Sequence, residues 1–387
     1  MEWAGSRGPL RFDRFMRVAL TDPAHGYYTA GPERTGRNGD FITSPEISAA
    51  FGECLGVQIA EMLARIGPGP RTIVELGAGN GSLALDVVRR LPPELADLTV
   101  LLVEASSERR ASQRRLFERH APVGCRLTQA ASLEEARRLA PGPLTGVVYS
   151  NEYFDALPVR VVRRSGETLE ELFVATGDER LVPAWQPAEE RLRVEAARWG
   201  AAPADGVTAE LGLEAAAAAS EIASWIGDGY HLIVDYGWPA AELYAPELRP
   251  SGTLLAYSEH RTNEEIFEQV GRQDLTAHVN FSALEDAGAA QGLVTEGFTT
   301  QDRFLVALGL ADRIVQLAAS MDPAAIRKRL SLMMLMHPSG MGRTFKILVQ
   351  SRGVRRQPLL AGLADPFARP VEGAEPAALG QPSFQRP

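Results

Sequence analysis

The chain has 387 residues, of which 45% are hydrophobic and 23% charged, and its formal net charge is −9 at pH 7. This composition is ordinary for a globular protein with one large domain or two, and the negative charge argues against nonspecific binding to nucleic acid. The two cysteines lack metal-site spacing, and no stretch is apolar enough for a signal peptide or a membrane span. We therefore expect a cytoplasmic protein with no metal, no membrane association and no nucleic-acid partner.

The N-terminal part, residues 10–66, is predicted to be helical with a loop in its middle. Ser44 and Pro45 are typical of the first positions of a helix. The residues that follow place one apolar face at three- and four-residue steps, which indicates a packed helix: Ile47, Phe51, Leu55, Ile59, Met62 and Ile66. Residues 1–70 are therefore predicted to form an N-terminal helical cover.

A glycine-rich loop follows, between an apolar strand that carries Glu75 and a helix that begins at Ser82. Glycine permits a sharp turn and the close approach of a ligand, and a helix N-terminus favours an anion. Dinucleotide-binding loops usually have their third glycine where this chain has Ser82. A glycine one position earlier, with an acid before the loop, is typical of enzymes that use S-adenosylmethionine. We expect that cofactor, with Glu75 near its amino group and four loop residues in contact with it: Gly77, Ala78, Gly79 and Gly81.

A second carboxylate supports this interpretation. The next apolar run ends at Glu104, which is about where α/β nucleotide sites place an acid on the ribose hydroxyls. The competing interpretation is an ordinary glycine-rich turn with an incidental surface acid. Glu75 and Glu104 together favour the cofactor site.

The order of the predicted elements indicates an α/β fold. Strands are expected at 72–76, 100–104, 146–149 and 231–236, separated by helical stretches, which favours a parallel sheet with helices on both faces. We predict a first half of the core at residues 71–165 and a second half at 229–350, with a last strand near 344–350.

Two stretches interrupt this alternation. A hairpin around Ser165 and an alanine-rich helical segment are expected within an insertion at residues 166–228. The irregular segment from Gly237 to about Asp274 is too long for a simple connection, and we expect it to cover a substrate. Residues 351–387, rich in proline and glycine, are predicted to be a flexible tail.

The strand at 146–149 leads into a cluster of polar residues that contains Asn151, Glu152 and Asp155. This is the carboxyl edge of the predicted sheet, where ligands bind in such folds. We expect Asn151 to contact the cofactor. Glu152 is predicted to be functional, although it could be an acid at a helix start, and Asp155 could equally cap a turn before Pro158.

These features resemble the MidA family of methyltransferases, whose mitochondrial members assist the assembly of respiratory complex I by dimethylating an arginine of a partner subunit. The resemblance extends to about residue 350. It rests on the glycine loop and on six further blocks, at residues 25–28, 39–46, 151–158, 235–237, 274–281 and 341–346. It implies a class I methyltransferase fold, with a Rossmann-like sheet, the N-terminal helical cover and inserted substrate elements. Tyr257 and His260 fit the family pattern in a segment that is shorter than expected, and the lack of a visible targeting leader suggests a bacterial relative.

The resemblance also implies roles for several residues. The block at 39–46 lies over the cofactor in this family, so we expect a lid with Thr43 and Ser44 near the cofactor carboxylate, although Ser44 could simply cap a helix. Because arginine is not deprotonated by a simple base, Glu152 and Asp155 would bind and polarise a guanidinium. His278 is either a substrate-site residue, the base for an O-methylation or a structural histidine.

The sequence thus predicts methylation of a protein, with arginine as the expected target. The alternatives are a small-molecule O- or N-methyltransferase and a non-catalytic assembly factor. The identity of the target and the oligomeric state are left open, a homodimer being one alternative.

Overall fold

The computed structural model describes residues 8–30, 44–95, 98–178, 180–258, 261–263 and 265–367. Its core is a sheet of eight strands in the order β15-β16-β10-β5-β2-β3-β4, with β14 paired to β10. Five strands, from β4 to β10, are mutually parallel, and β16 runs antiparallel to β10. The strands are β2 (Thr72–Leu76), β3 (Thr99–Val103), β4 (Arg126–Ala130), β5 (Leu144–Asn151), β10 (Ile226–Trp238), β14 (Val279–Asn280), β15 (Val294–Thr300) and β16 (Phe345–Arg352).

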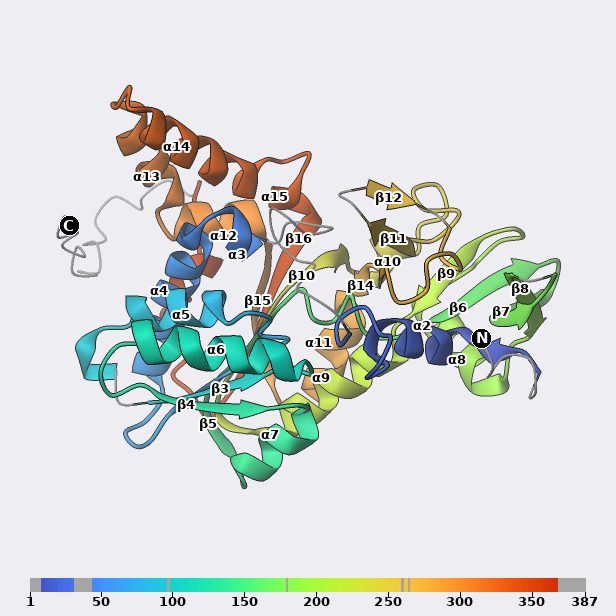
Figure 1. Ribbon diagram of the computed structural model, residues 1–387, viewed down its shortest axis with the longest axis horizontal. Helices are drawn as coiled ribbons and strands as arrows, with labels where there is room; N and C mark the ends of the chain where they lie inside the picture. The colour runs from blue at the N-terminus through green and yellow to red at the C-terminus, as the bar shows by residue number, and fades with distance from the viewer. Residues whose placement is uncertain are drawn as a thin grey trace.

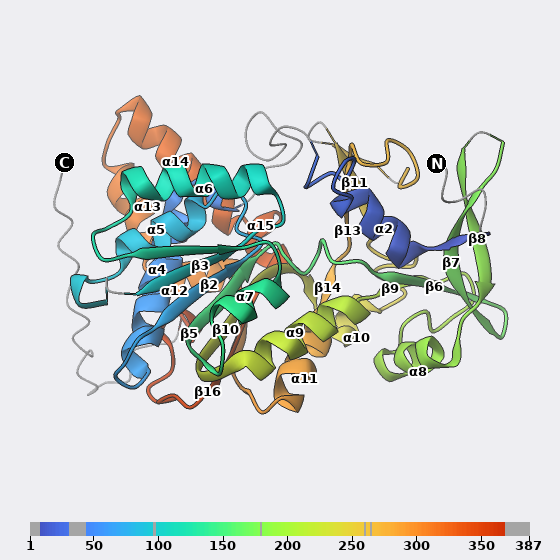
Figure 2. The ribbon, with the colours of Figure 1, turned by 60° about the horizontal axis from the view of Figure 1, so that its bottom comes forward.

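The strands are buried on both faces because their apolar residues alternate between two cores. Ile73 and Val147 point into one core, whereas Val74 and Val148 point into the other. Figure 2 shows the helices in two layers, one on each face of this sheet. The first layer contains α4 (Ala49–Arg65), α5 (Ser82–Arg90) and α6 (Ser107–His120), and the second contains α7 (Leu133–Leu139), α9 (Leu213–Trp225) and α11 (Phe281–Ala290).

This architecture confirms the predicted α/β class, the four predicted strands and the predicted last strand, which is β16, and it adds three strands. The sequence of β4 is largely polar, β15 contains three threonines and a glycine, and β14 has only two residues, so none of them forms an apolar run. A short 3-10 helix, Pro93–Leu95, precedes β3.

A second, antiparallel sheet lies beside the core, on the right in Figure 1. Its order is β1-β7-β6-β9, with β8 paired to β7. The predicted hairpin is therefore confirmed, as β6 and β7. The predicted helical segment is interrupted, because β9 separates α8 (Glu190–Trp199) from α9. The strands are β1 (Leu10–Arg11), β6 (Arg160–Ser165), β7 (Thr168–Thr176), β8 (Leu181–Pro187) and β9 (Thr208–Leu211).

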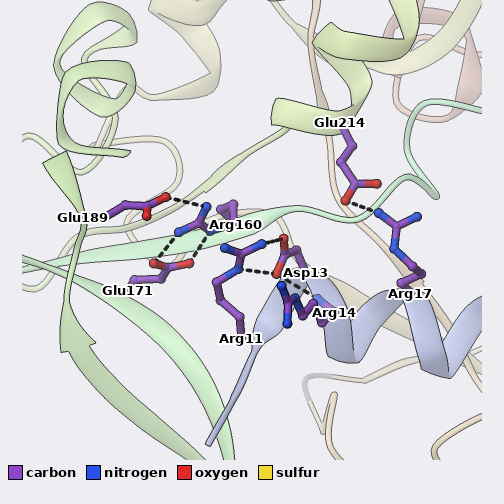
Figure 3. Close-up of polar contacts among 8 residues, drawn as sticks. All are labelled: Arg11, Asp13, Arg14, Arg17, Arg160, Glu171, Glu189 and Glu214. Atoms are coloured by element: carbon purple, nitrogen blue, oxygen red, sulfur yellow. Dashed lines mark hydrogen bonds and ion pairs between the residues drawn. The ribbon is translucent and has the colours of Figure 1, made fainter. Parts of the chain in front are cut away.

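The N-terminal helix α2 (Phe12–Thr21) packs on this second sheet, with Phe15 and Met16 in one core with Val161 and Leu172. Figure 3 shows ion pairs within this sheet and around α2, and the pair of Arg17 with Glu214 joins α2 to α9 of the core. Arg160 of β6 binds Glu171 and Glu189, Arg11 binds Asp13, and Arg17 binds Glu214.

The predicted single N-terminal cover is therefore divided. Helix α2 belongs to the second sheet, whereas α4 packs on the core sheet. The predicted helix start at Ser44 also needs correction. Ser44 begins only a short helix, α3 (Ser44–Ile47), and the long helix α4 begins after Ser48, whose side chain accepts a hydrogen bond from the backbone N–H of Ala50.

The segment after β10 contains more regular structure than predicted. After the short helix α10 (Ala240–Leu243) it forms a three-stranded sheet in the order β12-β11-β13. Its strands are β11 (Leu255–Ser258), β12 (Arg261–Asn263) and β13 (Asp274–Thr276).

Four helices lie between β15 and β16: α12 (Gln301–Ala307), α13 (Leu310–Ala318), α14 (Pro323–Met336) and α15 (Met341–Thr344). After β16 the chain returns to α4. Leu360 is buried, the backbone N–H of Gly362, in the 3-10 helix Ala361–Leu363, donates to Gln58 at 2.7 Å, and Arg65 donates to the Pro358 carbonyl. The predicted flexible tail is wrong for residues 358–362, because these contacts fix them on α4. Residues 368–387 lie outside the described part.

No helix within the described ranges combines the length and apolarity needed to cross a membrane.

Candidate active site

A cavity of about 660 Å³ opens at the carboxyl ends of the parallel strands. Each of the five strands delivers residues to it, because parallel strands end at the same edge of a sheet. Helix α2 and the three-stranded sheet β12-β11-β13, called the small sheet below, close the cavity from the other side. Tyr28, Tyr257 and Asp274 lie in this part of its wall. The lining residues from the strand ends are Gly77 after β2, Glu104 after β3, Ala131 after β4, Glu152 after β5 and Tyr236 within β10.

The glycine loop adopts the left-handed backbone that glycine favours. Gly77, Gly79 and Gly81 have φ values of 66°, 52° and 83°. A Cβ on Gly79 would meet no atom within 4 Å, so this residue borders open space in the cavity. Gly81 differs, since a Cβ there would come within 2.9 Å of Gln113, and Gly81 precedes α5 rather than lining the cavity. The close packing against Gln113 explains why this position is a glycine.

Glu104 holds the loop in place. Its carboxylate accepts hydrogen bonds from the backbone N–H groups of Gly79, at 3.0 Å, and Ser106, at 2.9 Å. Burial raises the pKa of Glu104, and these bonds act against that rise. Its carboxylate therefore lies beside the loop and lines the cavity, as a ribose-binding acid would.

Glu75 is buried and lines the cavity together with the glycine loop. Its side chain accepts a hydrogen bond from the Tyr149 hydroxyl at 2.9 Å. Burial raises the pKa of Glu75 to about 8. A positively charged group bound next to Glu75 would favour its ionised carboxylate and lower its pKa.

The loop after β5 has an unusual backbone at Glu152, whose φ of 53° lies in the left-handed region. Backbone and buried side-chain contacts hold it there. The N–H of Glu152 donates to the Val234 carbonyl, and Asp235 accepts from the N–H groups of Tyr153 and Phe154. Asp235 thus fixes the loop that presents Glu152, which the sequence analysis did not anticipate.

Glu152 and Asn151 lie side by side on the cavity wall, and Asn151 donates to the Glu152 carboxylate at 2.9 Å. The side-chain oxygen of Asn151 is buried and has no hydrogen-bond partner among the described residues. Such an oxygen is an acceptor suited to a bound ligand's N–H or O–H group.

Asp155 is buried and also lines the cavity, so it is not a simple turn cap. One oxygen accepts a hydrogen bond from the Tyr236 hydroxyl, and the other has no partner within the described chain. Burial raises the pKa of Asp155 to about 6. An acceptor left over in this way fits a substrate that donates hydrogen bonds.

His278 lines the cavity with its ring against Tyr236, at 5.4 Å between centroids. Burial and the nearby charges of Arg249 and Lys346 lower its pKa to about 4. The imidazole is therefore neutral at pH 7 but a weak base, which disfavours it as the base of an O-methylation.

The predicted lid is the block at residues 39–46. Thr43 lies outside the described residues. Ser44 is buried, and its hydroxyl donates to Gln301 at 3.3 Å instead of lining the cavity, whereas the adjacent Pro45 does line it. Burial and the hydrogen bond to Gln301 account for Ser44.

Several residues of the wall were not predicted from the sequence to be site residues: Tyr28, Arg109, Ser132, Tyr236, Asp274 and Thr276. Tyr28, Tyr236, Asp274 and Thr276 all occur in the blocks that carry the family resemblance. Ser132 follows β4, so recognising that strand would have placed it at the carboxyl edge. Among the described residues, no group of histidines, cysteines and carboxylates could hold a metal ion.

Comparison with known proteins identifies the family. Residues 54–299 match a family of S-adenosyl-L-methionine-dependent methyltransferases. The chain belongs to this family.

Individual relatives that are named methyltransferases match this chain over most of their length. The chain is 31% identical to human protein arginine methyltransferase NDUFAF7, mitochondrial, over 95% of this chain and 87% of that protein. It is 30% identical to the zebrafish (Danio rerio) protein, over 93% and 88% of the two chains. These relatives confirm the MidA-like family that the sequence predicts.

The methyltransferase also resembles a crystal structure from Burkholderia thailandensis, a candidate methyl transferase bound to S-adenosylhomocysteine. The TM-score is 0.82 and the identity 31%, over 94% of this chain and 92% of that one. The cavity fits such a ligand in three respects: open space at Gly79, the carboxylates of Glu75 and Glu104, and the unpartnered oxygen of Asn151. The chain is thus an S-adenosylmethionine-dependent methyltransferase.

Proposed function

We propose that this methyltransferase acts on the guanidinium group of an arginine in a protein substrate. The observation that carries the proposal is the pair of carboxylates, Glu152 and Asp155, that line the same cavity. Among the described residues, no arginine, lysine or histidine forms an ion pair with Asp155. A cation in the substrate would supply the missing partner and hydrogen-bond donors.

The bound cofactor supplies a methyl group on a positively charged sulfur. The residues of this chain have to hold the accepting nitrogen in line with that methyl group and keep water out. An arginine nitrogen is a poor nucleophile because its lone pair is delocalised, and its pKa lies above about 12. Carboxylates that accept its hydrogen bonds localise electron density on the reacting nitrogen and neutralise the charge, and one of them takes the proton that this nitrogen loses as its bond to the methyl group forms and the sulfur–methyl bond breaks.

The curated relatives support this target, because their names describe protein arginine methyltransferases. Methylation of a hydroxyl is less well supported, since it would require a base and His278 has a lowered pKa. A non-catalytic role is disfavoured by the acids that line the cavity, Glu75, Glu104 and Glu152.

The proposal can be tested with radiolabelled S-adenosylmethionine and a bacterial lysate. We expect label in protein that is recovered as methylarginine after acid hydrolysis. The Glu152→Gln variant, with cofactor affinity measured in parallel, is the control for background transfer. Label found in methyllysine or only in small molecules would overturn the proposal.

A further inference from the structure

Asp274 and Tyr28 form a polar pair in the wall of the cavity. The Tyr28 hydroxyl donates a hydrogen bond to Oδ1 of Asp274 at 2.7 Å. Asp274 begins β13 of the small sheet, and Tyr28 lies in the turn after α2. Two inserted parts of the chain therefore meet at this point, and both residues line the cavity.

The charge of Asp274 is not balanced by a close cation. Within the described residues no lysine, arginine or histidine forms an ion pair with it. Arg109 lies over the Tyr28 ring, with its guanidinium carbon 5.9 Å from the ring centroid, and its charge lowers the Asp274 pKa only slightly. Burial and the charge of Asp155 act in the opposite direction, and the Asp274 pKa is raised to about 7.

Asp155 and Asp274 face a shared space. Burial raises the pKa values of Tyr28 and Tyr257, two tyrosines of this wall, and the charge of Asp155 raises them further. In addition, the N–H of Ala277, just after β13, donates to the Asp155 carbonyl at 3.2 Å, which ties the two segments together. The two carboxylates are arranged alike, since each accepts one tyrosine hydroxyl, Asp155 from Tyr236 and Asp274 from Tyr28.

We propose that Asp274 is a substrate-binding residue that, with Asp155, selects a guanidinium group over an ammonium group. This inference rests on the proposed function and extends it to a second binding carboxylate. A guanidinium presents five N–H donors in a plane and can reach carboxylates on two walls, whereas an ammonium offers three donors at one point. Each tyrosine hydroxyl fixes its carboxylate and leaves acceptor positions for the substrate.

The binding can be measured without knowledge of the natural target. Ethylguanidinium and ethylammonium are titrated by calorimetry into the full-length protein saturated with S-adenosylhomocysteine. We expect ethylguanidinium to bind more tightly, and its binding near pH 6.5 to release protons because a cation stabilises the ionised carboxylates. Proton release is obtained from heats measured in two buffers of different ionisation enthalpy.

The Asp274→Asn variant should bind ethylguanidinium about tenfold or more weakly and release fewer protons, while S-adenosylhomocysteine affinity stays within about twofold. Tyr28→Phe, which removes only the orienting hydroxyl, should weaken binding less, and it tests the inference even if Asp274→Asn does not fold. Asp286→Asn, in an exposed ion pair with Arg198, is the matched control. Unchanged affinity in both Asp274→Asn and Tyr28→Phe would overturn the inference, as would equal losses for the two probes.

The two proposals fail separately. Formation of methylarginine by the wild-type protein, with unchanged guanidinium binding in Asp274→Asn, contradicts only the role of Asp274. Loss of ethylguanidinium binding in Asp274→Asn, with label only in small molecules, contradicts only the proposed protein-arginine target.

Discussion

Tyr149 donates a hydrogen bond to Glu75 across two neighbouring strands, β5 and β2, at 2.9 Å. Both side chains are buried, and the Glu75 carboxyl has a pKa raised to about 8 by that burial. Glu75 lines the cavity together with the residues of the glycine loop, and Tyr149 supports it from behind the wall.

The first prediction concerns pH. Between about pH 4.5 and 8, folded protein without cofactor keeps a proton on Glu75 that the unfolded chain releases, so this group's contribution to the free energy of unfolding falls as pH rises through that window. The ammonium of S-adenosylhomocysteine favours ionised Glu75, so its affinity should rise from pH 6 to pH 8, by at most about tenfold per unit. Calorimetry should show a flatter dependence for Glu75→Gln. An unchanged slope in that variant would assign the effect to another group.

The second prediction concerns Gly79. Gly79→Val should abolish binding of S-adenosylhomocysteine in a folded protein, because the side chain would enter open space of the cavity. Gly166→Val is a matched control, since Gly166 also has a left-handed backbone, with φ 56°, and no atom within 4 Å of its added Cβ. Both variants incur similar backbone strain. Retained affinity in Gly79→Val would show that the loop does not hold the cofactor.

The third prediction concerns Glu104. Glu104→Ala should weaken cofactor binding by roughly 1.5 to 3 kcal/mol if the carboxylate binds the ribose hydroxyls. The sequence alone suggests little change in melting temperature, but Glu104 also accepts hydrogen bonds from Gly79 and Ser106, so the melting temperature should fall as well. Calorimetry and thermal unfolding separate the two effects. A lower melting temperature with full affinity would make Glu104 purely structural.

The fourth prediction compares Glu152 with His278. Glu152→Gln should nearly stop methyl transfer while leaving cofactor affinity almost intact, because a neutral amide cannot neutralise a guanidinium. His278→Ala should be less damaging, since the imidazole is a weak base with a pKa near 4. Single-turnover rates with labelled cofactor measure both. Arginine methylation would be rejected if His278→Ala eliminated turnover and Glu152→Gln kept most of it.

The fifth prediction concerns the buried ion pair within the second sheet. Arg160→Met leaves Glu171 buried without its main partner, and the free energy of unfolding should fall by about 3–5 kcal/mol. Arg193→Met removes an exposed ion pair with Glu190 and should have little effect. Denaturant unfolding measures both changes. Equal stabilities would mean that the apolar contacts of this sheet suffice.

Local patterns in the sequence determined the parallel strands, the glycine loop and the three acids Glu75, Glu104 and Glu152. Their signals are short in range: an apolar run, glycines at fixed spacing and a carboxylate at a strand end. The hairpin at β6 and β7 was predictable for the same reason.

Tertiary structure alone decided which distant segments complete the cavity. Tyr28 meets Asp274 across 246 positions of sequence, and Asp235 holds the loop at Glu152 from 81 positions away. No local pattern encodes such pairs, because they depend on how α2 and the small sheet pack beside the core. The same limit explains the errors. The long helix begins after Ser48 rather than after Ser44, the N-terminal cover is divided between two sheets, and residues 358–362 are fixed by contacts with α4, because burial and long-range hydrogen bonds outweigh local preferences.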